Sequence, residues 1–416
     1  MSENRKDLEN AKGKIPNQMY KRLGLGEKKY VQLLKGVSGV IGLNDPVGIV
    51  TLHRELHDGL NLKRVACPIG VLCVIFEARP EAAVQIASLA LKSGNAVILK
   101  GGSEANLSNR ALVSAMREAL KCTDVPEDTI QLVSSRQDVH HLLKLDEYID
   151  LVIPRGSRSL VRKIQQSTRI PVMGHADGIC SVYVDEEANV ETAVRVTVDS
   201  KTNYPAACNA CETLLVHHKI LEKALIPIGM KLKSRGVTKI HADKHTIQYL
   251  PQDITVPSKE QDFRTEFGCL EIAVKCVKST KDAIDHINSH GSSHTDCIVT
   301  ENSSTAKQFM NAVDSAGVYH NASTRFADGF RYGFGAEVGV STNRLHARGP
   351  VGMEGLLTYK YKLSGKGHIV EEFGVGKKEY THRDVQEEKK RDMTCMISVV
   401  LSVVVVGALC VRKMLS

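Results

Sequence analysis

Cys208 is the residue of this sequence best suited to nucleophilic chemistry. It follows a Tyr-Pro-Ala-Ala segment within residues 201–216, where a helix-like stretch, 189–200, gives way to an apolar, strand-like stretch, 213–216. A proline and a run of small residues predict a loop, so the thiol should be accessible to a substrate carbonyl. A thiol in such a position can accept an acyl group and hold it as a covalent intermediate.

Cys208 also forms a Cys-x-x-Cys pattern with Cys211, which leaves two alternatives open. A zinc site would need further ligands, and no second Cys-x-x-Cys accompanies this one. A redox dithiol usually begins a helix directly after a strand, and no strand is predicted directly before Cys208. Two inert core cysteines would be the plainest alternative. We favour one nucleophile, Cys208, with Cys211 as packing, and predict no metal site here.

Two turns are suited to binding phosphate groups. Lys100-Gly-Gly-Ser103 follows the strand-like stretch 96–99, and Arg155-Gly-Ser157 follows 149–153. Turns at the carboxyl ends of parallel strands present backbone N–H groups to anions. Neither turn matches a dinucleotide or P-loop fingerprint, and either alone could be an ordinary tight turn. Together they predict a dinucleotide site.

The composition is that of an ordinary folded protein with an intracellular pattern of cysteines. The 416 residues are enough for two or three domains, and 42% are hydrophobic. The formal charge of +8 suits anionic ligands, but the chain has no Trp and only 5% aromatic residues, which argues against nucleic-acid binding. Eleven irregularly spaced cysteines and the lack of a secretory signal argue against a disulfide framework.

The apolar pattern predicts two α/β regions and a separate hairpin. Residues 47–67 alternate around His57-Asp58-Gly59, which is a turn signal. Short apolar strands alternate with amphipathic helices up to about residue 170, and a second such region follows Cys208 to about residue 330. This alternation predicts parallel sheets covered by helices. Residues 329–355 are rich in glycine and predict a loop, and 356–369 predict a late strand that returns to the hairpin.

The end of the sequence predicts a membrane anchor. Residues 376–392 are highly charged and predict a linker, whereas 393–411 contain no charged residue over a length that can span a bilayer. A buried core helix is the alternative. We expect a C-terminal transmembrane tail anchor whose catalytic domain faces the cytosol, on a membrane that could be mitochondrial.

Six motifs resemble those of γ-glutamyl phosphate reductases, and the resemblance extends from about residue 40 to 370. It is strongest to the reductase half of eukaryotic Δ1-pyrroline-5-carboxylate synthase, and it implies an aldehyde dehydrogenase-like α/β fold. The implied parts are an NADPH-binding domain with a small oligomerisation sheet that includes the hairpin, a catalytic domain and a glycine-rich return, whereas the charged linker and the transmembrane helix follow from the sequence pattern and not from the resemblance. The NADPH-binding domain is predicted at 1–200, the catalytic domain at 201–335 and the glycine-rich return at 336–375. The charged linker is predicted at 376–392 and the transmembrane helix at 393–411. The motifs are 68–80, 92–103, 149–156, 174–179, 204–209 and 346–350.

The resemblance also implies roles in cofactor binding. Lys100 would face the adenosine ribose with Ser103 nearby, and Gly156 and Ser157 would lie near the pyrophosphate. Glu266 would hold the nicotinamide ribose. Many NAD-dependent members of the superfamily have a glutamate where Ser103 stands. A glutamate would repel a 2′-phosphate, so serine beside lysine favours NADPH.

The resemblance implies that Cys208 is the catalytic thiol and that the reaction is a reduction. Hydrolytic aldehyde dehydrogenases use a glutamate to activate water, but residues 174–177 read Gly-His-Ala-Asp. We therefore expect Cys208 to displace phosphate from L-glutamyl 5-phosphate, and NADPH to reduce the thioester to L-glutamate 5-semialdehyde for proline biosynthesis. His175 could supply a proton at collapse or be structural. The Cys208 N–H, with Asn209, would serve the developing oxyanion.

Arginines are the expected ligands for the phosphate and α-carboxylate of the substrate. Arg79, Arg325 and Arg331 are the candidates, although surface ion pairs are the commoner role of arginine. A separate glutamate 5-kinase would supply the substrate, and a homo-oligomer is expected. The N-terminus is shorter than usual for the family, so we expect initial helices to be missing. An oxidative semialdehyde dehydrogenase and a non-catalytic scaffold are the alternative functions.

Overall fold

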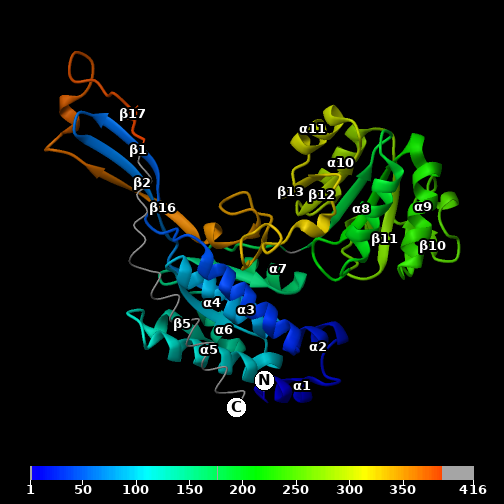
Figure 1. Cartoon of the computed structure of the whole chain (residues 1–416), viewed down its shortest axis with the longest axis horizontal. Helices are drawn as coiled ribbons and strands as arrows, with labels where there is room; N and C mark the ends of the chain where they lie inside the picture. Colours follow the sequence, from blue (N-terminus) through cyan, green and yellow to red (C-terminus); the bar gives the residue numbers. More distant parts are fainter. Residues whose placement is uncertain (1, 176, 387–416) are drawn as a thin grey trace. The chain divides into compact units, whose positions relative to one another are not determined.

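A computed structural model describes residues 2–175 and 177–386. The chain divides into two compact units (Figure 1). The first contains Met1–Met173, Gly333–Gly339 and the residues from Val351 onward, and the second contains Gly174–Tyr332 and Val340–Pro350. Each unit is described separately below.

A parallel four-stranded sheet, in the order β5-β4-β3-β6, forms the centre of the first unit. Residues of β3 are apolar and buried almost throughout, as expected for a strand covered on both faces. Cys73 and Ile75 of this strand pack with Ile164 of a helix in one hydrophobic cluster. The predicted parallel α/β sheet is therefore confirmed. The elements are β3 (Val71–Phe76), α4 (Pro80–Lys92), β4 (Ala96–Lys100), α5 (Asn106–Leu120), β5 (Ile130–Leu132), α6 (Arg136–Leu142), β6 (Leu151–Arg155) and α7 (Arg158–Ser167).

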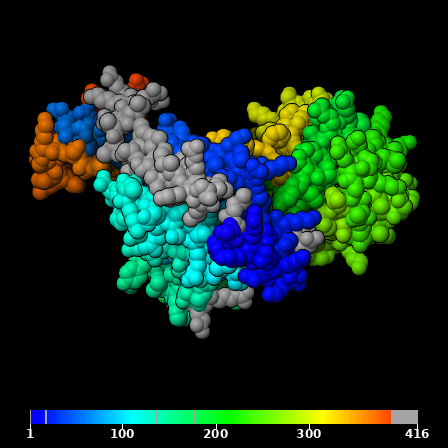
Figure 2. All heavy atoms as spheres, turned by 60° about the horizontal axis from the view of Figure 1, so that its bottom comes forward, coloured from blue at the N-terminus to red at the C-terminus, as the bar shows by residue number. Residues whose placement is uncertain are grey.

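Three helices precede this sheet in the chain. They are α1 (Ser2–Ala11), α2 (Asn17–Leu23) and α3 (Glu27–Gly42). The buried carboxylate of Asp7 in α1 accepts hydrogen bonds from the backbone N–H and the hydroxyl of Ser108 in α5, at 2.7 and 2.6 Å. These bonds fasten α1 to the sheet's helical layer, and the blue N-terminal surface adjoins the cyan surface in Figure 2.

A separate antiparallel sheet contains the predicted hairpin. Its strands are β1 (Val50–His57), β2 (Leu60–Pro68), β16 (Leu357–Ser364) and β17 (Arg383–Asp384), in the order β16-β2-β1-β17. Gly59 has a φ of +73° in the turn between β1 and β2, a backbone conformation that glycine adopts without strain. The hairpin is confirmed, and the late strand pairs with it as expected (blue beside orange in Figure 1).

The second unit is built on a seven-stranded parallel sheet in the order β10-β9-β11-β8-β7-β12-β13. Alternate residues of the central strands face two different hydrophobic clusters, one with α8 and α9 and the other with α10 and α11. Helices therefore cover both faces. The strands are β7 (Cys180–Val184), β8 (Cys211–His217), β9 (Lys239–Ala242), β10 (Thr255–Pro257), β11 (Glu271–Val277), β12 (Thr295–Val299) and β13 (Gly317–His320). The helices are α8 (Val190–Thr202), α9 (Leu221–Ser234), α10 (Thr280–His290) and α11 (Ser303–Ala312).

The predicted glycine-rich loop contains little regular structure. Its two short strands, β14 (Gly339–Ser341) and β15 (Gly349–Val351), form a two-stranded sheet.

The transmembrane part of the predicted fold is corrected. Residues 393–411, where the span was predicted, lie outside the described residues. Among residues 2–175 and 177–386, no helix has the length and apolar character needed to cross a membrane. We therefore withdraw the transmembrane helix, the membrane as a partner and the membrane localisation.

Candidate active site

Cys208 lies in the loop between α8 and β8, as the sequence predicts. The side chain of Asn189 caps the start of α8 by accepting the Thr192 N–H, and the helix ends at Thr202. Tyr204 then adopts a left-handed backbone with a φ of +61°, which turns the chain sharply. The Cys208 side chain is only partly buried, so it remains accessible.

A buried ion pair joins the two ends of this loop. Lys201 is in the last turn of α8 and Glu212 is the second residue of β8, and their Nζ and Oε2 atoms are 2.5 Å apart with both side chains fully buried. The other Glu212 oxygen accepts the Gly268 N–H at 3.2 Å. Burial raises the pKa of Glu212, to about 7, although the Lys201 charge acts in the opposite direction. The pair holds the loop that presents Cys208.

Removing one partner of this ion pair should destabilise the second unit more than replacing both partners with apolar residues. We expect Glu212→Leu alone to lower the melting temperature sharply, because an unpaired buried lysine costs about 3–5 kcal/mol. The double variant Lys201→Met/Glu212→Leu should regain most of the loss, because no buried charge remains. Differential scanning calorimetry would measure both. A double variant that is no more stable than Glu212→Leu alone would contradict this role of the pair.

Two histidines contact the Cys208 thiol. His294, directly before β12, places Nε2 3.2 Å from Sγ and is completely buried. His175 also hydrogen-bonds the thiol, and its Nδ1 donates to the Val340 carbonyl at 2.9 Å, which leaves Nε2 to face Cys208. The two imidazole rings lie edge to face with centroids 4.9 Å apart. The thiol is therefore surrounded by hydrogen-bond donors.

These contacts favour a thiolate at neutral pH. Burial raises the pKa of Cys208, but the charges and hydrogen bonds of His294 and His175 outweigh burial and hold that pKa well below its usual value. Burial lowers the pKa of His175, but the thiolate, the Val340 carbonyl and Glu266 raise it to about 9. The pair is best described as a thiolate beside an imidazolium, which is an activated nucleophile.

This charge pair predicts a distinctive pH dependence of alkylation at Cys208. An ordinary thiol loses its thiolate as the pH falls through about 8.5. Since the pKa of Cys208 is lowered, its labelling by iodoacetamide should stay fast well below that pH. In His294→Gln the pKa should rise, so labelling at pH 7 should slow by about tenfold for each unit by which the new pKa exceeds 7. Peptide mass spectrometry at several pH values measures this; an unchanged profile in His294→Gln would refute the role of His294.

Gly178 lies directly against the Cys208 backbone. A Cβ at residue 178 would stand 2.1 Å from the Cys208 carbonyl oxygen, so only glycine allows this approach. The Gly178 N–H donates to Glu266 Oε2 at 3.0 Å. Burial raises the pKa of Glu266, and the Gly178 N–H partly offsets this. Glu266 and Gly178 thus support the segment that carries the nucleophile.

The neighbouring cysteines are poor nucleophiles. Cys211 is fully buried at the start of β8, where its thiol donates to the Thr213 carbonyl, and burial raises its pKa to about 12. Cys180 is also fully buried, its thiol donates to the Cys208 carbonyl, and burial raises its pKa well above the usual value. Among these three thiols, Cys208 alone is both partly exposed and lowered in pKa.

The other predicted residues of the second unit lie around the same loop. Asn209 is buried, and its Nδ2 donates to the Ala327 carbonyl at 2.8 Å, so this amide holds the following loop. Arg325 is buried and donates to the Asn203 carbonyl at 2.5 Å; burial and the Arg331 charge lower its pKa, whereas Cys208 raises it. Arg331 donates to the Arg325 carbonyl. The third predicted arginine, Arg79, belongs to the first unit.

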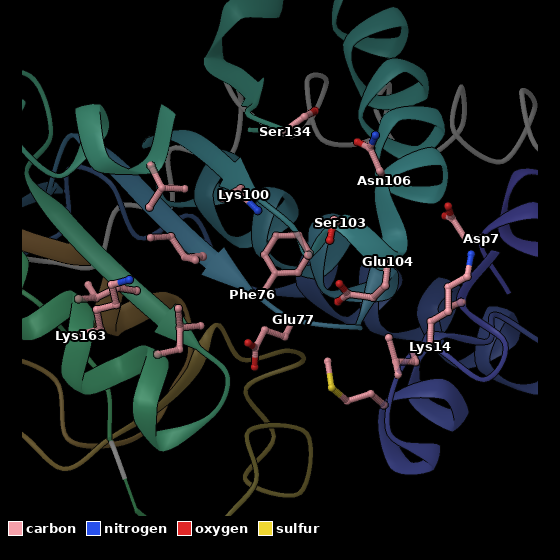
Figure 3. Close-up of a pocket in the computed structure, with 18 of the residues that line it drawn as sticks. Asp7, Lys14, Phe76, Glu77, Lys100, Ser103, Glu104, Asn106, Ser134 and Lys163 are labelled. Atoms are coloured by element: carbon pink, nitrogen blue, oxygen red, sulfur yellow. The ribbon is translucent and has the colours of Figure 1, made fainter. Parts of the chain in front are cut away.

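The first unit contains a cavity of about 880 Å³ at the carboxyl ends of β3 and β4 (Figure 3). This volume is within the range of small-molecule and cofactor sites, about 300–1,000 Å³. Lys100 and Ser103 line it, as does Lys163 of α7. Its apolar wall includes Val139, Leu143, Leu160 and Ile164.

The predicted pyrophosphate residues follow β6 at the start of α7. The Ser157 N–H donates to Glu77 Oε2 at 3.0 Å, and Glu77 itself lines the cavity. A Cβ at Gly156 would lie 2.5 Å from the same oxygen and 2.7 Å from Leu160 Cδ2, so a larger residue would have to displace these two side chains. An acceptor thus already occupies the helix N-terminus predicted to bind phosphate. The remaining cofactor residue, Glu266, belongs to the second unit.

His294, Gly178 and the Lys201–Glu212 pair were not predicted from the sequence. The local signal at His294 is its four-residue spacing from His290, but His290 instead contacts Glu260 at 2.6 Å. Gly178 has an ordinary φ, and its importance arises from a neighbour 30 residues away in the sequence. These roles depend on contacts that local patterns do not encode.

Comparison with known proteins identifies the family of the chain. The aldehyde dehydrogenase family profile matches residues 60–246. The chain is 54% identical to γ-glutamyl phosphate reductase of Nostoc punctiforme over 90% of this chain and 86% of that protein. It is 50% identical to a probable γ-glutamyl phosphate reductase of Schizosaccharomyces pombe over 92% of this chain and 88% of that protein.

A solved structure extends the similarity to the fold. The crystal structure of γ-glutamyl phosphate reductase from Thermotoga maritima is 43% identical, with a TM-score of 0.84, and covers 88% of this chain and 89% of that one. The chain therefore belongs to the γ-glutamyl phosphate reductase family, the glutamate-5-semialdehyde dehydrogenases of proline biosynthesis, within the aldehyde dehydrogenase superfamily.

Proposed function

We propose that the enzyme reduces L-glutamyl 5-phosphate to L-glutamate 5-semialdehyde through a thioester on Cys208, with NADPH as the reductant and phosphate as the leaving group. One observation carries this proposal: the Cys208 thiol is accessible and lies between two histidines that hold its pKa well below the usual value. Such a thiolate is nucleophilic at neutral pH and is also a good leaving group.

In the first step the Cys208 thiolate attacks the acyl carbon of the substrate. A C–S bond forms, the bond from that carbon to the phosphate oxygen breaks, and its electron pair leaves with the phosphate. His175 and His294 are the proton donors nearest the thiol, so one of them can protonate the departing oxygen. The Cys208 N–H can stabilise the oxyanion of the tetrahedral intermediate. Asn209 supports this role by holding the loop through Ala327.

In the second step the acyl group on Cys208 is reduced and released. When bound, NADPH supplies the hydride for this step. The resulting hemithioacetal collapses, the C–S bond breaks, and Cys208 leaves as a thiolate beside the two histidines. Residues 174–177 contain no glutamate to activate water, which favours reduction over hydrolysis of the thioester. Arg325 and Arg331, whose guanidinium groups lie on the loop beside Asn203 and Asp328, are the proposed ligands for the substrate's acidic groups.

The cavity of the first unit fits the adenosine half of NADPH. Its apolar wall, which includes Val139 and Ile164, suits a flat base. Lys100 and Lys163 supply positive charge for phosphate. Lys100 is nearly buried at the end of β4, and Ser103 begins the following turn (Figure 3). Lys100 and Ser103 would hold the 2′-phosphate. Gly156 and Ser157 would approach the pyrophosphate once Glu77 releases the Ser157 N–H, and Glu266 would hold the nicotinamide ribose.

The cofactor assignment predicts a change in preference. Ser103→Glu should lower kcat/KM for the phosphorylated cofactor by about ten- to a hundredfold relative to the non-phosphorylated one, because a carboxylate repels a 2′-phosphate at short range. Ser103→Ala is the matched control and should change the ratio little. Initial rates with NADP+ and NAD+ would measure the ratio of the two kcat/KM values. An unchanged ratio in Ser103→Glu would place the 2′-phosphate elsewhere.

The reverse reaction tests the whole proposal. Pyrroline-5-carboxylate, NADP+ and inorganic phosphate should give NADPH at a rate that depends on phosphate, because phosphate is the acceptor that resolves the thioester. Equal rates without phosphate would show hydrolysis and support the oxidative semialdehyde dehydrogenase instead. No turnover in either direction would support a non-catalytic scaffold.

A further inference from the structure

We infer that His175, Cys208 and His294 also form a binding site for a soft divalent cation, foremost Zn²⁺, and that the bound metal blocks the nucleophile. The consequence for activity rests on the proposed function, whereas the binding itself does not. One ligand atom from each of these side chains lies within 4.8 Å of the other two. Sulfur and imidazole nitrogen are the ligands that Zn²⁺ prefers in proteins.

The distances suit tetrahedral coordination with little movement. Bond lengths of about 2.3 Å for Zn–S and 2.0–2.1 Å for Zn–N place tetrahedral ligand atoms roughly 3.3–3.6 Å apart. The Cys208 Sγ and His294 Nε2 atoms are 3.2 Å apart, close to that spacing. Bringing in His175 requires a shift of at most about 1.5 Å from the 4.8 Å limit.

The Nδ1 atoms of His175 and His294 already have oxygen partners of the kind that metal-bound histidines usually have. His175 Nδ1 contacts the Val340 carbonyl, and His294 Nδ1 contacts the Thr295 hydroxyl, each at 2.9 Å. Oxygen partners of this kind orient imidazole ligands and raise their basicity. Both Nε2 atoms are thus directed towards the thiol before any metal arrives.

This set differs from the Cys-x-x-Cys pattern of the sequence. Cys211 takes no part, because its thiol is fully buried and donates to the Thr213 carbonyl. The three ligands leave a fourth position for water, as open zinc sites do. On binding, a Zn–S bond forms at Cys208 and the thiol proton, or the proton shared with a histidine, passes to solvent. The sulfur lone pair is then engaged, so acylation cannot begin.

Binding can be measured without reference to activity. The metal-free full chain should bind Zn²⁺ in calorimetry with one equivalent that requires Cys208, and Co²⁺ at that site should show thiolate-to-metal absorption. Cys211→Ser should keep both signals. His294→Gln should weaken binding at least about tenfold, as expected for loss of a ligand. Cys208→Ser should lose the absorption band while circular dichroism shows an unchanged fold. Equal Zn²⁺ affinity in the parent and His294→Gln, or Co²⁺ without the thiolate band, would overturn the site.

An activity measurement separates this inference from the proposed function. Zn²⁺ should inhibit the reverse reaction over the concentration range in which it binds, and EDTA should restore the rate. If Zn²⁺ binds at Cys208 but turnover continues, the metal site stands and the nucleophile assignment fails. If no Cys208-dependent binding occurs while Cys208→Ala is inactive, the metal site fails and the proposed function stands.

Discussion

Replacing Cys208 with alanine should abolish turnover, with a loss of at least about four orders of magnitude, because no other group can form the thioester. The fold should survive, since the side chain is partly exposed and the Lys201–Glu212 pair holds the loop independently. NADP+ reduction by pyrroline-5-carboxylate with phosphate measures the loss, and calorimetry confirms folding.

Cys211→Ser is the matched control for this substitution. It removes a thiol three residues away, but one whose pKa is raised to about 12 by burial and which remains protonated. We expect activity within about an order of magnitude of the parent and some loss of stability, because a hydroxyl replaces a buried apolar group. Equal inactivation by both substitutions, in folded protein, would indicate a dithiol mechanism and contradict the single nucleophile.

Gly178→Ala should lower kcat by at least about a hundredfold, because a displacement of about 1 Å at a reacting group can cost that much. The new Cβ would lie 2.1 Å from the Cys208 carbonyl oxygen and 2.6 Å from its Cα, and these backbone atoms must move to accommodate it. The movement would shift the thiol away from His294 and His175. Steady-state kinetics measures the loss of kcat, and slower alkylation at pH 7 would report the disturbed contacts.

Gly42→Ala provides the control for the Gly178 substitution. Gly42 ends α3 in the first unit, and a Cβ there would meet no atom within 4 Å. This variant should keep full activity. A Gly178→Ala enzyme with normal kcat would mean that the Cys208 backbone is free to move without harm, contrary to the positioning argued here.

The sequence by itself determined most of the sheet elements and the loop position of Cys208. The apolar run 71–76 is a buried strand, and Gly59 forms its turn through its own backbone freedom. Cys208 is predicted to lie in a loop because its neighbours are a proline and several small residues. In each case the physical cause lies within a few residues, and a linear pattern can therefore report it. The predicted membrane span relied on apolar length alone, and it was withdrawn because no described helix meets that requirement.

The tertiary structure alone decided which groups activate the cysteine. His294 is 86 residues from Cys208 and reaches it because β12 pairs in parallel with β7, next to β8. Lys201 in an amphipathic helix would be expected in solvent, yet it is fully buried because Glu212 lies opposite. Parallel pairing is set by crossover connections and by the burial of whole strand faces. Contacts made across such a sheet depend on the order of its strands, which no local spacing contains.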